Sequence, residues 1–454
     1  MLWAARECGS AALGDARLTQ RLVSITSALA EHPESSLPAA LGEWPDTKAA
    51  YRFLDNQKVT AKAIYNAHRE ATVERTRGQS VLLAVQDTTI FNFTLHRKTK
   101  GLGPIGQTGL SGFFLHSCLG VSADGVPLGL LAHRLWVRPS EAKDSRKTHK
   151  ARPLGDKESS RWLKVTADAT KGIPPTTKVV MVGDRESDIF DLFLLATQRG
   201  YDILVRAAWD RRLDASEDHL WEAVESTPVL GQTSIRTPRS DDRPERTATL
   251  TLQTASVTLR PPPHRKKEQL AAPTLNALLV RESSPPEGEE PIEWMLLTTL
   301  PITTFPEALQ VLNWYTYRWR IERYHYILKS GCQVEKLQLE TADRLMRALA
   351  VYSIVAWRLL WLTHQARQNP EASCMVALSD SEWQALYAKV NKTTTLPGDP
   401  PSLRTAVHWI AKLGGFLGRK SDGEPGVKVL WRGLRRLQDL AAMWELFRPP
   451  PTCG

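Results

Sequence analysis

The sequence predicts a mixed α/β core with helical segments on both sides of it, and three observations carry this prediction. Between residues 80 and 206, short apolar runs and alternating stretches are followed by segments with helical periodicity. From about 208 to 300 the chain is strand-like and rich in proline, and from Pro306 helical spacing returns. Strands that alternate with helices are typical of an α/β fold. The expected domains are a helical N-terminal domain (1–70), a core (71–368) with a β-strand insertion (about 208–300), and a helical C-terminal domain (369–454).

The N-terminal segment has the pattern of short helices separated by polar turns. An apolar stripe with helical spacing consists of Leu18, Leu22, Ile25 and Leu29 and stops at His32-Pro33. The segment VTAKAIYNAHRE opens with Thr60, a residue type that favours helix N-caps. In WPDTKAAYRFLDN, Lys48, Tyr51 and Arg52 lie within one helical turn of each other. Such a cluster suits a DNA-binding unit, and a core tyrosine beside solvated basic residues is the alternative.

The central region contains a series of strand patterns. SVLLAVQDTTIFNFT predicts a buried strand, and FFLHSCLGVSADGVPLGLLAHRLWVRP predicts two strands around a turn at Ala123-Asp124-Gly125. KESSRWLKVTADAT predicts a helix, KVVMVGDRESDIFDLFLLATQRG a strand, a loop and a helix, and YDILVRAA a further strand. RTATLTLQTASVTLR and LNALLVRE alternate as strands do. The helices that follow are predicted in PEALQVLNWYTYRWRIERYHYILKSG, TADRLMRALAVYSIVAWRLLWLTHQAR, RTAVHWIAKLGGFLGRK and VKVLWRGLRRLQDLAAMWELF.

Composition restricts the class of protein. The 454 residues are 42% hydrophobic, and the net charge of +10 has the sign that suits a polyanionic partner. The five cysteines show no C-x-x-C pair and no zinc-ligand spacing, which favours a reducing cytosol. The start has no signal-peptide pattern, and the longest apolar run, LMRALAVYSIVAWRLLWL, carries Arg347 and Arg358. We therefore expect a soluble, cytoplasmic protein with no membrane partner.

The segment YTYRWRIERYHYILKSG, residues 315–331, sets a single acidic residue among four arginines and lysines. On a helix that turns about 100° per residue, Tyr315, Arg318, Glu322 and Lys329 fall within roughly 40° of the Glu322 direction. The simplest interpretation is a solvated face with an i, i+4 pair of Arg318 and Glu322, worth only a few tenths of a kcal/mol. The rest of the chain has to decide whether this polar stripe is functional.

Two other acidic residues stand at the ends of predicted strands. Asp87 follows the apolar run of AVQDTT, and Asp184 follows that of VVMVGDRESD. α/β folds place their sites at this edge of the sheet. For each residue alone, a turn or helix-capping role is the alternative, and for Asp184 an N-cap is especially credible because a helical pattern follows.

The three acidic residues together point to a metal site. Asp87, Asp184 and Glu322 in one place would repel one another strongly unless a cation neutralised them. Carboxylate oxygens suit Mg²⁺ or Mn²⁺, and two such ions serve phosphoryl transfer. Arg318 and Lys329 would then hold phosphates, which explains the basic surroundings of Glu322.

At this point the sequence resembles a known family. The spacing Tyr315-x2-Arg318-x3-Glu322-x6-Lys329 is similar to the Y-R-E-K signature of bacterial DDE transposases, closest to those of family-four insertion sequences and of the composite kanamycin-resistance transposon. SAALGDAR, AYRF, DTT, KES with a following tryptophan, DRESD, WMLLT and IAKLGGFLGRK also resemble that family, in the same order. The resemblance implies a ribonuclease-H-like core with a β insertion, and a bacterial, nucleoid-associated enzyme.

The resemblance also implies roles for individual residues. Asp87, Asp184 and Glu322 would be catalytic and would bind the metal, Mg²⁺ or in its place Mn²⁺, with two ions per site. Trp294 would stack on a flipped base, although before MLLT it also fits a core position. His325 is either a DNA contact or a structural histidine, and Tyr326 stands where a relative has a lysine. The implied DNA-binding residues are Tyr315, Arg318, Lys329, Arg206, Trp294 and His325, with Lys48, Tyr51 and Arg52 in the N-terminal module.

The function implied is cut-and-paste transposition. A homodimer would bind double-stranded terminal inverted repeats, nick the 3′ end, form and open a DNA hairpin, and join the 3′-OH ends to target DNA. Two alternatives stay open. A catalytically silent protein that binds transposon ends would keep the basic residues without cleavage, and a structure-specific nuclease would share the metal site without strand transfer.

Overall fold

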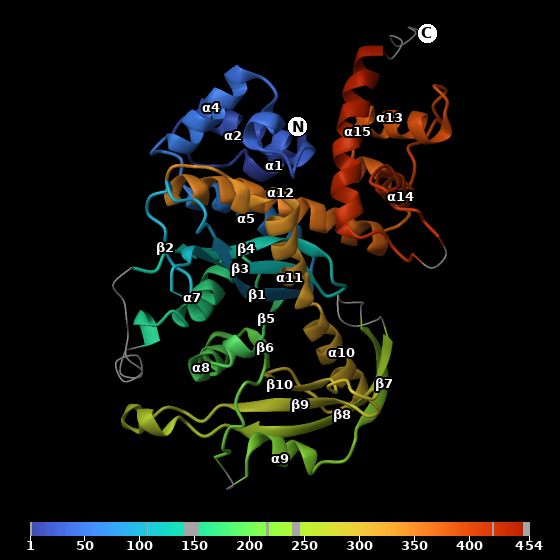
Figure 1. The fold of residues 1–454 in the computed structure, drawn as a ribbon. Coiled ribbons are helices and arrows are strands. Elements are labelled where there is room, and N and C mark those ends of the chain that lie inside the picture. Colours follow the sequence, from blue (N-terminus) through green and yellow to red (C-terminus); the bar gives the residue numbers. More distant parts are fainter. Residues whose placement is uncertain are drawn as a thin grey trace.

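The computed structural model describes residues 2–106, 108–139, 154–214, 218–237, 246–419 and 422–447. Within these residues the strands form one ten-stranded mixed sheet in the order β2-β3-β1-β5-β6-β10-β9-β8-β7, with β4 paired to β3 (Figure 1). The strands are β1 (Val81–Asn92), β2 (Gly103–Pro104), β3 (Ser111–Ser122), β4 (Pro127–Trp136), β5 (Lys178–Gly183), β6 (Asp202–Arg206), β7 (Gly231–Thr237), β8 (Arg246–Thr258), β9 (Thr274–Glu282) and β10 (Glu293–Thr298).

Helices precede, cover and follow this sheet, so the expected mixed α/β class is confirmed. The α-helices are α1 (Leu2–Cys8), α2 (Ala16–Glu31), α3 (Leu37–Leu41), α4 (Trp44–Asp55), α5 (Ala61–Thr76), α7 (Ser160–Ala169), α8 (Phe190–Arg199), α9 (Leu220–Glu225), α10 (Phe305–Thr316), α11 (Trp319–Tyr326), α12 (Ala342–Gln368), α13 (Asp380–Asn391), α14 (Leu403–Leu413) and α15 (Val427–Phe447). Short 3₁₀ turns include η2 (Arg185–Ser187) and η6 (Cys374–Val376), and η4 (Ile327–Gly331) is a π-helix.

The centre of the sheet is parallel and its two sides are antiparallel. β1 pairs in parallel with β5, and β5 in parallel with β6, whereas β3 runs antiparallel to β1. The strands of the proline-rich region 208–300 continue the same sheet, because β10 pairs antiparallel with β6 through Leu296↔Arg206. The β-rich region therefore extends the core sheet at the edge of β6.

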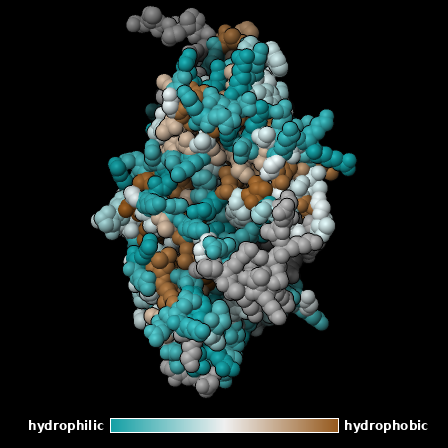
Figure 2. Space-filling model, turned by 90° about the vertical axis from the view of Figure 1, so that its left-hand side faces the viewer, coloured by the Kyte–Doolittle hydropathy of each residue, from teal (hydrophilic) through white to brown (hydrophobic). Residues whose placement is uncertain are grey.

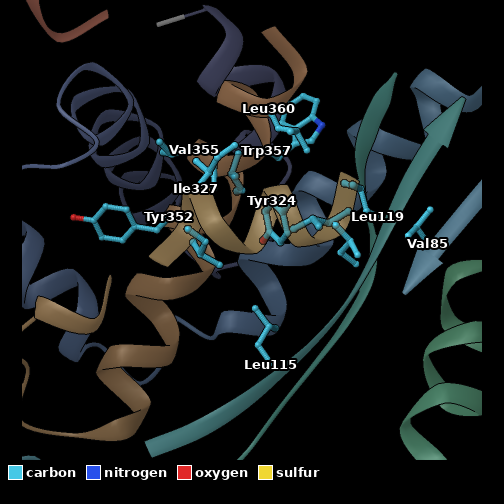
Figure 3. Packing of buried hydrophobic residues seen from close by; sticks show 14 of the residues in the cluster. Val85, Leu115, Leu119, Tyr324, Ile327, Tyr352, Val355, Trp357 and Leu360 are labelled. Atoms are coloured by element: carbon cyan, nitrogen blue, oxygen red, sulfur yellow. The ribbon is translucent and has the colours of Figure 1, made fainter. Parts of the chain in front are cut away.

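Each face of the sheet has its own hydrophobic core, as the period-two alternation of strands requires. Leu83 and Val85 of β1 face the cluster that contains α12 and the N-terminal helices, and Leu82 and Ala84 face the cluster under α7 and α8. In Figure 3, Tyr324 of α11 lies between Leu119 of β3 and the side chains of α12. Helix α11, which carries Glu322, is thus packed between sheet and α12.

Helix α12 lies inside the protein. It is long and apolar enough to cross a membrane by length and composition, but 83% of its most apolar window is buried in the structure, as in a core helix. Two of its arginines donate to backbone carbonyls: Arg347 Nη1 to that of Leu54 at 2.7 Å, and Arg358 Nη2 to that of Ala377 at 2.7 Å. Much of the surface in Figure 2 is hydrophilic, with apolar residues in separate groups. Helix α12 therefore belongs to the interior of the protein.

The N-terminal helices share the core of the sheet. The predicted N-cap at Thr60 is confirmed, since its side chain accepts from the Ala63 amide, but the proposed domain boundary at residue 70 falls inside α5. Tyr65 of α5 is hydrogen-bonded to Ser353 of α12 at 2.7 Å, and both lie in the interior. Helix α5 therefore belongs at once to the N-terminal helices and to the core.

The segment 315–331 is not the single straight helix assumed from the sequence. α10 ends at Thr316, α11 begins at Trp319, and η4 replaces the last α-helical turn. The π-helix is closed by the Cys332 amide, which donates to the Ile327 carbonyl at 2.8 Å. A π turn contains more residues than an α turn, so Lys329 is rotated away from the direction that regular helical spacing gives.

Candidate active site

The register of the parallel strands brings two aspartates side by side. β1 and β5 pair up to Val85↔Val182, and two residues further on Asp87 lies opposite Asp184. β5 and β6 pair at Gly183↔Val205, so the next position sets Arg206 beside Asp184. Neighbouring strands are about 4.8 Å apart. Asp87, Asp184 and Arg206 therefore form a row across β1, β5 and β6.

The positions of the two aspartates differ in one respect from those expected. Asp87 does not end its strand, because β1 continues to Asn92 through antiparallel pairing with β3. It lies where the pairing with β5 stops, and this cannot be read from the apolar run. Asp184 directly follows β5, and its carboxylate accepts from the Glu186 amide at 2.9 Å, so it caps η2. The capping alternative describes this contact correctly.

The electrostatics of Asp184 fit a cation. Burial raises the pKa of its carboxyl, and the negative charge of Asp87 raises this pKa further, while Arg318 acts in the opposite direction. Two close carboxylates in a partly buried place repel each other, and a divalent cation would remove that repulsion. The donor set therefore fits Mg²⁺ or Mn²⁺.

Glu322, the third predicted metal ligand, lies on α11 and forms an ion pair with Arg318. Its Oε1 accepts from Arg318 Nη1 at 2.6 Å, and its side chain is 51% exposed. Among the residues that the structure describes, no group of three or more His, Cys, Asp or Glu side chains is close enough to share a metal ion. In this structure Glu322 is therefore paired with Arg318 and not grouped with the two aspartates.

His325 fixes α11 over β1. Its Nδ1 lies 3.4 Å from Asp87 Oδ2, and its Nε2 lies 3.4 Å from Ser117 Oγ of β3. The side chain is 7% exposed. Because His325 stands one turn after Glu322, this contact holds Glu322 near Asp87. These contacts support the interpretation of His325 as a structural histidine.

Three predicted phosphate-binding side chains gather around Asp184. Arg206 donates to the Glu293 carbonyl at 2.9 Å, and burial lowers its pKa while the nearby Tyr315 opposes that change. Tyr315 is only 4% exposed, and the guanidinium carbon of Arg318 lies 5.9 Å from its ring centroid. The Nε of Arg318 is buried and has no hydrogen-bond partner among the described residues. This orphaned donor is available to an anionic oxygen.

Lys329 and Trp294 lie differently from the stripe expected on one helix. Lys329 Nζ is 5.6 Å from the centroid of the Phe91 ring, toward the end of β1. Trp294, the second residue of β10, is 7% exposed and contacts Tyr315 and Trp319, with centroids 5.5 and 5.9 Å away. The core alternative for Trp294 describes this packing. Trp319 beside it is 37% exposed and was not singled out in the sequence.

The N-terminal candidates lie on a separate surface. Lys48, Tyr51 and Arg52 are exposed on α4, and Trp44 at the start of this helix is 71% exposed. Trp44 was missed, although an aromatic residue one turn from Lys48 was visible in WPDTK. The four side chains form one exposed face of basic and aromatic character.

A hydrogen-bond network behind the aspartates was also missed. Arg161 of α7 donates through Nε to Thr88 Oγ1 at 3.0 Å and through Nη2 to Glu186 Oε2 at 2.6 Å. His116 continues the network, with Nδ1 2.8 Å from Thr88 Oγ1 and Nε2 2.8 Å from Gln86 Oε1. Thr88 follows Asp87, and the Glu186 amide binds Asp184. Arg161 therefore links the chain segments that carry both aspartates, and the only signal was its place in KESSRW.

A mixed sheet with paired aspartates, a glutamate on the covering helix and arginines around them would suit a metal-dependent enzyme that acts on phosphodiesters. Comparison with family sequence models agrees. Residues 1–59 match the Transposase DNA-binding family, residues 156–357 the Transposase DDE domain, and residues 354–448 the Transposase Tn5 dimerisation domain. Together these matches support a Tn5-type DDE transposase with a domain for DNA binding and a domain for dimerisation.

The DDE domain implies a ribonuclease-H-like core and a metal-dependent enzyme that cleaves and joins DNA. Asp184 and Glu322 lie inside the matched range of this domain, whereas Asp87 lies between the DNA-binding and DDE matches. The assignment of Asp87 therefore rests on its register with Asp184.

Proposed function

We propose that this protein is a cut-and-paste transposase that binds terminal inverted repeats, cleaves them through a 3′ nick and a hairpin, and joins the freed 3′-OH ends to target DNA. The observation that carries the proposal is the row of Asp87, Asp184 and Arg206, with Glu322 and Arg318 above it. It sets acidic oxygen donors directly beside phosphate-binding donors. The Y-R-E-K spacing of the sequence supports the same assignment.

In this proposal Asp87, Asp184 and Glu322 hold two divalent cations. Such ions, when bound, neutralise charge on the reacting phosphate and favour ionisation of the attacking hydroxyl. The protein's own part is positioning. Once Glu322 leaves Arg318, this guanidinium has its donors free for a phosphate oxygen, and Arg206 offers a second cation on the far side of Asp184.

The proposed roles around the phosphate follow from position. Tyr315 supports Arg206 and Arg318 from within the core, and Lys329 reaches the strand end near Phe91. Stacking of a flipped base on Trp294 would need this side chain to become accessible, and the partly exposed Trp319 packs edge-on against it. Lys48, Tyr51 and Arg52 would contact the terminal repeat. The proposed domains are the N-terminal DNA-end-binding helices, the catalytic core and the C-terminal dimerisation helices.

The test is cleavage of duplexes that carry the element's terminal repeats, with Mg²⁺ or with EDTA, resolved on a denaturing gel. We expect a nick, then a hairpin, and with added plasmid a joined product. Glu322→Gln should abolish all three while leaving DNA binding intact. Glu340→Gln is the matched control, because it removes another i, i+4 pair, with Arg344 at 3.0 Å. Binding without cleavage in any metal would identify a silent end-binding protein, and cleavage without joining a nuclease.

A further inference from the structure

The exposed face of α11 continues from Glu322 to a second group of arginines. With about 100° per residue, Arg323 and Arg320 lie roughly 100° and 160° around the helix from Glu322. Trp319 and Tyr326, roughly 60° and 40° around the helix from Glu322, lie between Glu322 and Arg323 and are 37% and 40% exposed. A surface of aromatic and basic side chains therefore runs from the proposed catalytic acid around α11, and such surfaces are typical of nucleic-acid contacts.

The end of α12 supplies the third arginine of this group. Arg320 Nε donates to the Gly125 carbonyl at 3.3 Å, and Gln368 Nε2 donates to the Asp124 carbonyl at 2.9 Å. Both side chains thus dock on the same turn between β3 and β4. Arg367, next to Gln368, donates through Nη2 to the Pro425 carbonyl at 3.1 Å. The turn joins the end of α12 to the outer side of α11.

The turn between β3 and β4 allows the side chains of α11 to pack closely against it. Gly125 has a φ of 85°, which favours glycine, and a Cβ there would lie 3.1 Å from the Tyr317 ring. Arg320 stacks over that ring, with its guanidinium carbon 5.2 Å from the centroid, and Arg323 lies 5.7 Å from the centroid of Tyr326. The arginines are therefore held by rings and neutral carbonyls.

The group carries an excess of positive charge. Burial lowers the pKa of Arg320, and the positive charges of Arg367 and Arg323 lower it further. The pKa of the neighbouring His364 falls to about 2 through burial and the charges of these arginines. The carboxylate that raises the pKa of Arg367 is Glu424, which is itself bound to Arg404 at 2.5 Å and to His408 at 3.0 Å. Guanidinium groups with remaining donors are well suited to phosphate oxygens.

We propose that Arg320, Arg323 and Arg367 form a second phosphate-binding site that holds a DNA backbone on the side of α11 turned away from Asp87 and Asp184. An α-helix with side chains is about 10 Å wide, so DNA held at Glu322 reaches this site within a few nucleotides. The ligand is a phosphodiester backbone, which belongs either to the transposon end or to the target duplex. Only the choice between these two sources depends on the proposed function.

The test uses the full-length double variant Arg323→Gln/Arg367→Gln, which removes two exposed charges outside the proposed catalytic site. The matched control is Arg199→Gln/Lys389→Gln, which removes two exposed charges elsewhere. The affinity for a pre-cleaved terminal-repeat duplex is measured by anisotropy between about 50 and 200 mM salt. Joining of the same duplex is measured against increasing plasmid target. Arg323→Lys/Arg367→Lys should restore either property, and thermal melting checks the fold.

Each phosphate contact contributes about 0.9 to the salt slope of duplex binding. If the salt slope of duplex binding is smaller by about 1–2 in Arg323→Gln/Arg367→Gln but not in the control, the transposon end occupies the site. An unchanged slope with a several-fold higher half-saturating target concentration places the target there. A double variant that equals the charge-matched control in both measurements overturns the proposal. Because binding is measured without cleavage, a protein that binds but never cleaves would disprove the proposed function and leave this inference standing.

Discussion

At the residue scale, Asp184 is destabilising in the folded protein when it is ionised, because burial and Asp87 raise its pKa. Asp184→Asn keeps a side-chain oxygen for the cap on Glu186 and removes the repulsion. We expect this variant to be inactive and to unfold, in EDTA at neutral pH, with a free energy about 0.5 kcal/mol larger than the unchanged protein. Mg²⁺ should raise the melting temperature of the unchanged protein and not that of the variant. An equal rise in both would argue against a metal at Asp184.

Also at this scale, Arg161 is expected to position both aspartates through Thr88 and Glu186. Residues that orient metal-binding groups typically change metal affinity or activity about 10–100-fold when replaced. Arg161→Gln should therefore need more Mg²⁺ for half-maximal cleavage, and Arg161→Lys should recover part of the loss. Arg138→Gln removes a neighbouring pair with Glu158 and serves as the control. An unchanged Mg²⁺ dependence in Arg161→Gln would contradict this positioning role.

At the scale of elements, α1, α5 and β4 are joined by Glu7, His68 and Arg75. His68 donates through Nδ1 to Glu7 at 2.7 Å and accepts at Nε2 from the Leu130 amide at 3.1 Å, so it is neutral. Burial raises the pKa of Glu7, but bonds from His68 and Arg75 outweigh this and lower it to about 2. Burial lowers the pKa of His68. Both groups therefore stabilise the fold at neutral pH and lose that contribution on acidification.

The pH dependence follows from these directions. Stability should begin to fall below about pH 6.5, where His68 is protonated in the unfolded chain, and fall further from 4.5 towards 2 through Glu7. Glu7→Gln should lose about 3 kcal/mol at pH 7 and flatten the lower part of the curve. Denaturant unfolding of both proteins between pH 7 and pH 3 measures the loss of stability and the shape of its pH dependence. Parallel curves for variant and unchanged protein would show that Glu7 is not the titrating group.

A second junction of elements is the contact between η4 and α15. A Cβ on Gly331 would lie 2.9 Å from the Trp431 ring, so Gly331→Ala must displace the first turns of α15. Overpacking of this kind typically costs about 1–3 kcal/mol. Thermal unfolding should show this loss, and limited proteolysis should cut near α15 more readily. Gly426→Ala, where a Cβ meets nothing within 4 Å, should leave both unchanged. Equal melting of the two variants would show that η4 and α15 are not coupled.

At the scale of the whole molecule, the sequence predicted the elements better than their connections. Periodicity in SVLLAVQDTT and VVMVGD located β1 and β5, but only the register Val85↔Val182 sets Asp87 opposite Asp184. The π turn of η4 and the burial of Trp294 depend on packing against Trp431 and Trp319, which are distant in sequence. The side-chain network of Arg161 likewise forms only when α7 docks. Local patterns report local structure, and the site is assembled by long-range contacts.

The N-terminal helices are not expected to fold independently of the core. Tyr65 binds Ser353 at 2.7 Å, the His68 ring accepts from the Leu130 amide, and Arg75 donates to the Leu128 carbonyl at 2.5 Å. A fragment of residues 1–77 keeps all of α5 but loses these partners and the apolar surface of α12. We therefore expect no cooperative thermal transition in its circular dichroism, in contrast to the full chain, and terminal-repeat binding weakened well beyond the loss expected from charge alone. A sharp transition in the isolated fragment would show that DNA-end recognition folds as a separate domain, whereas its absence ties recognition of the DNA end to the same core that positions Glu322.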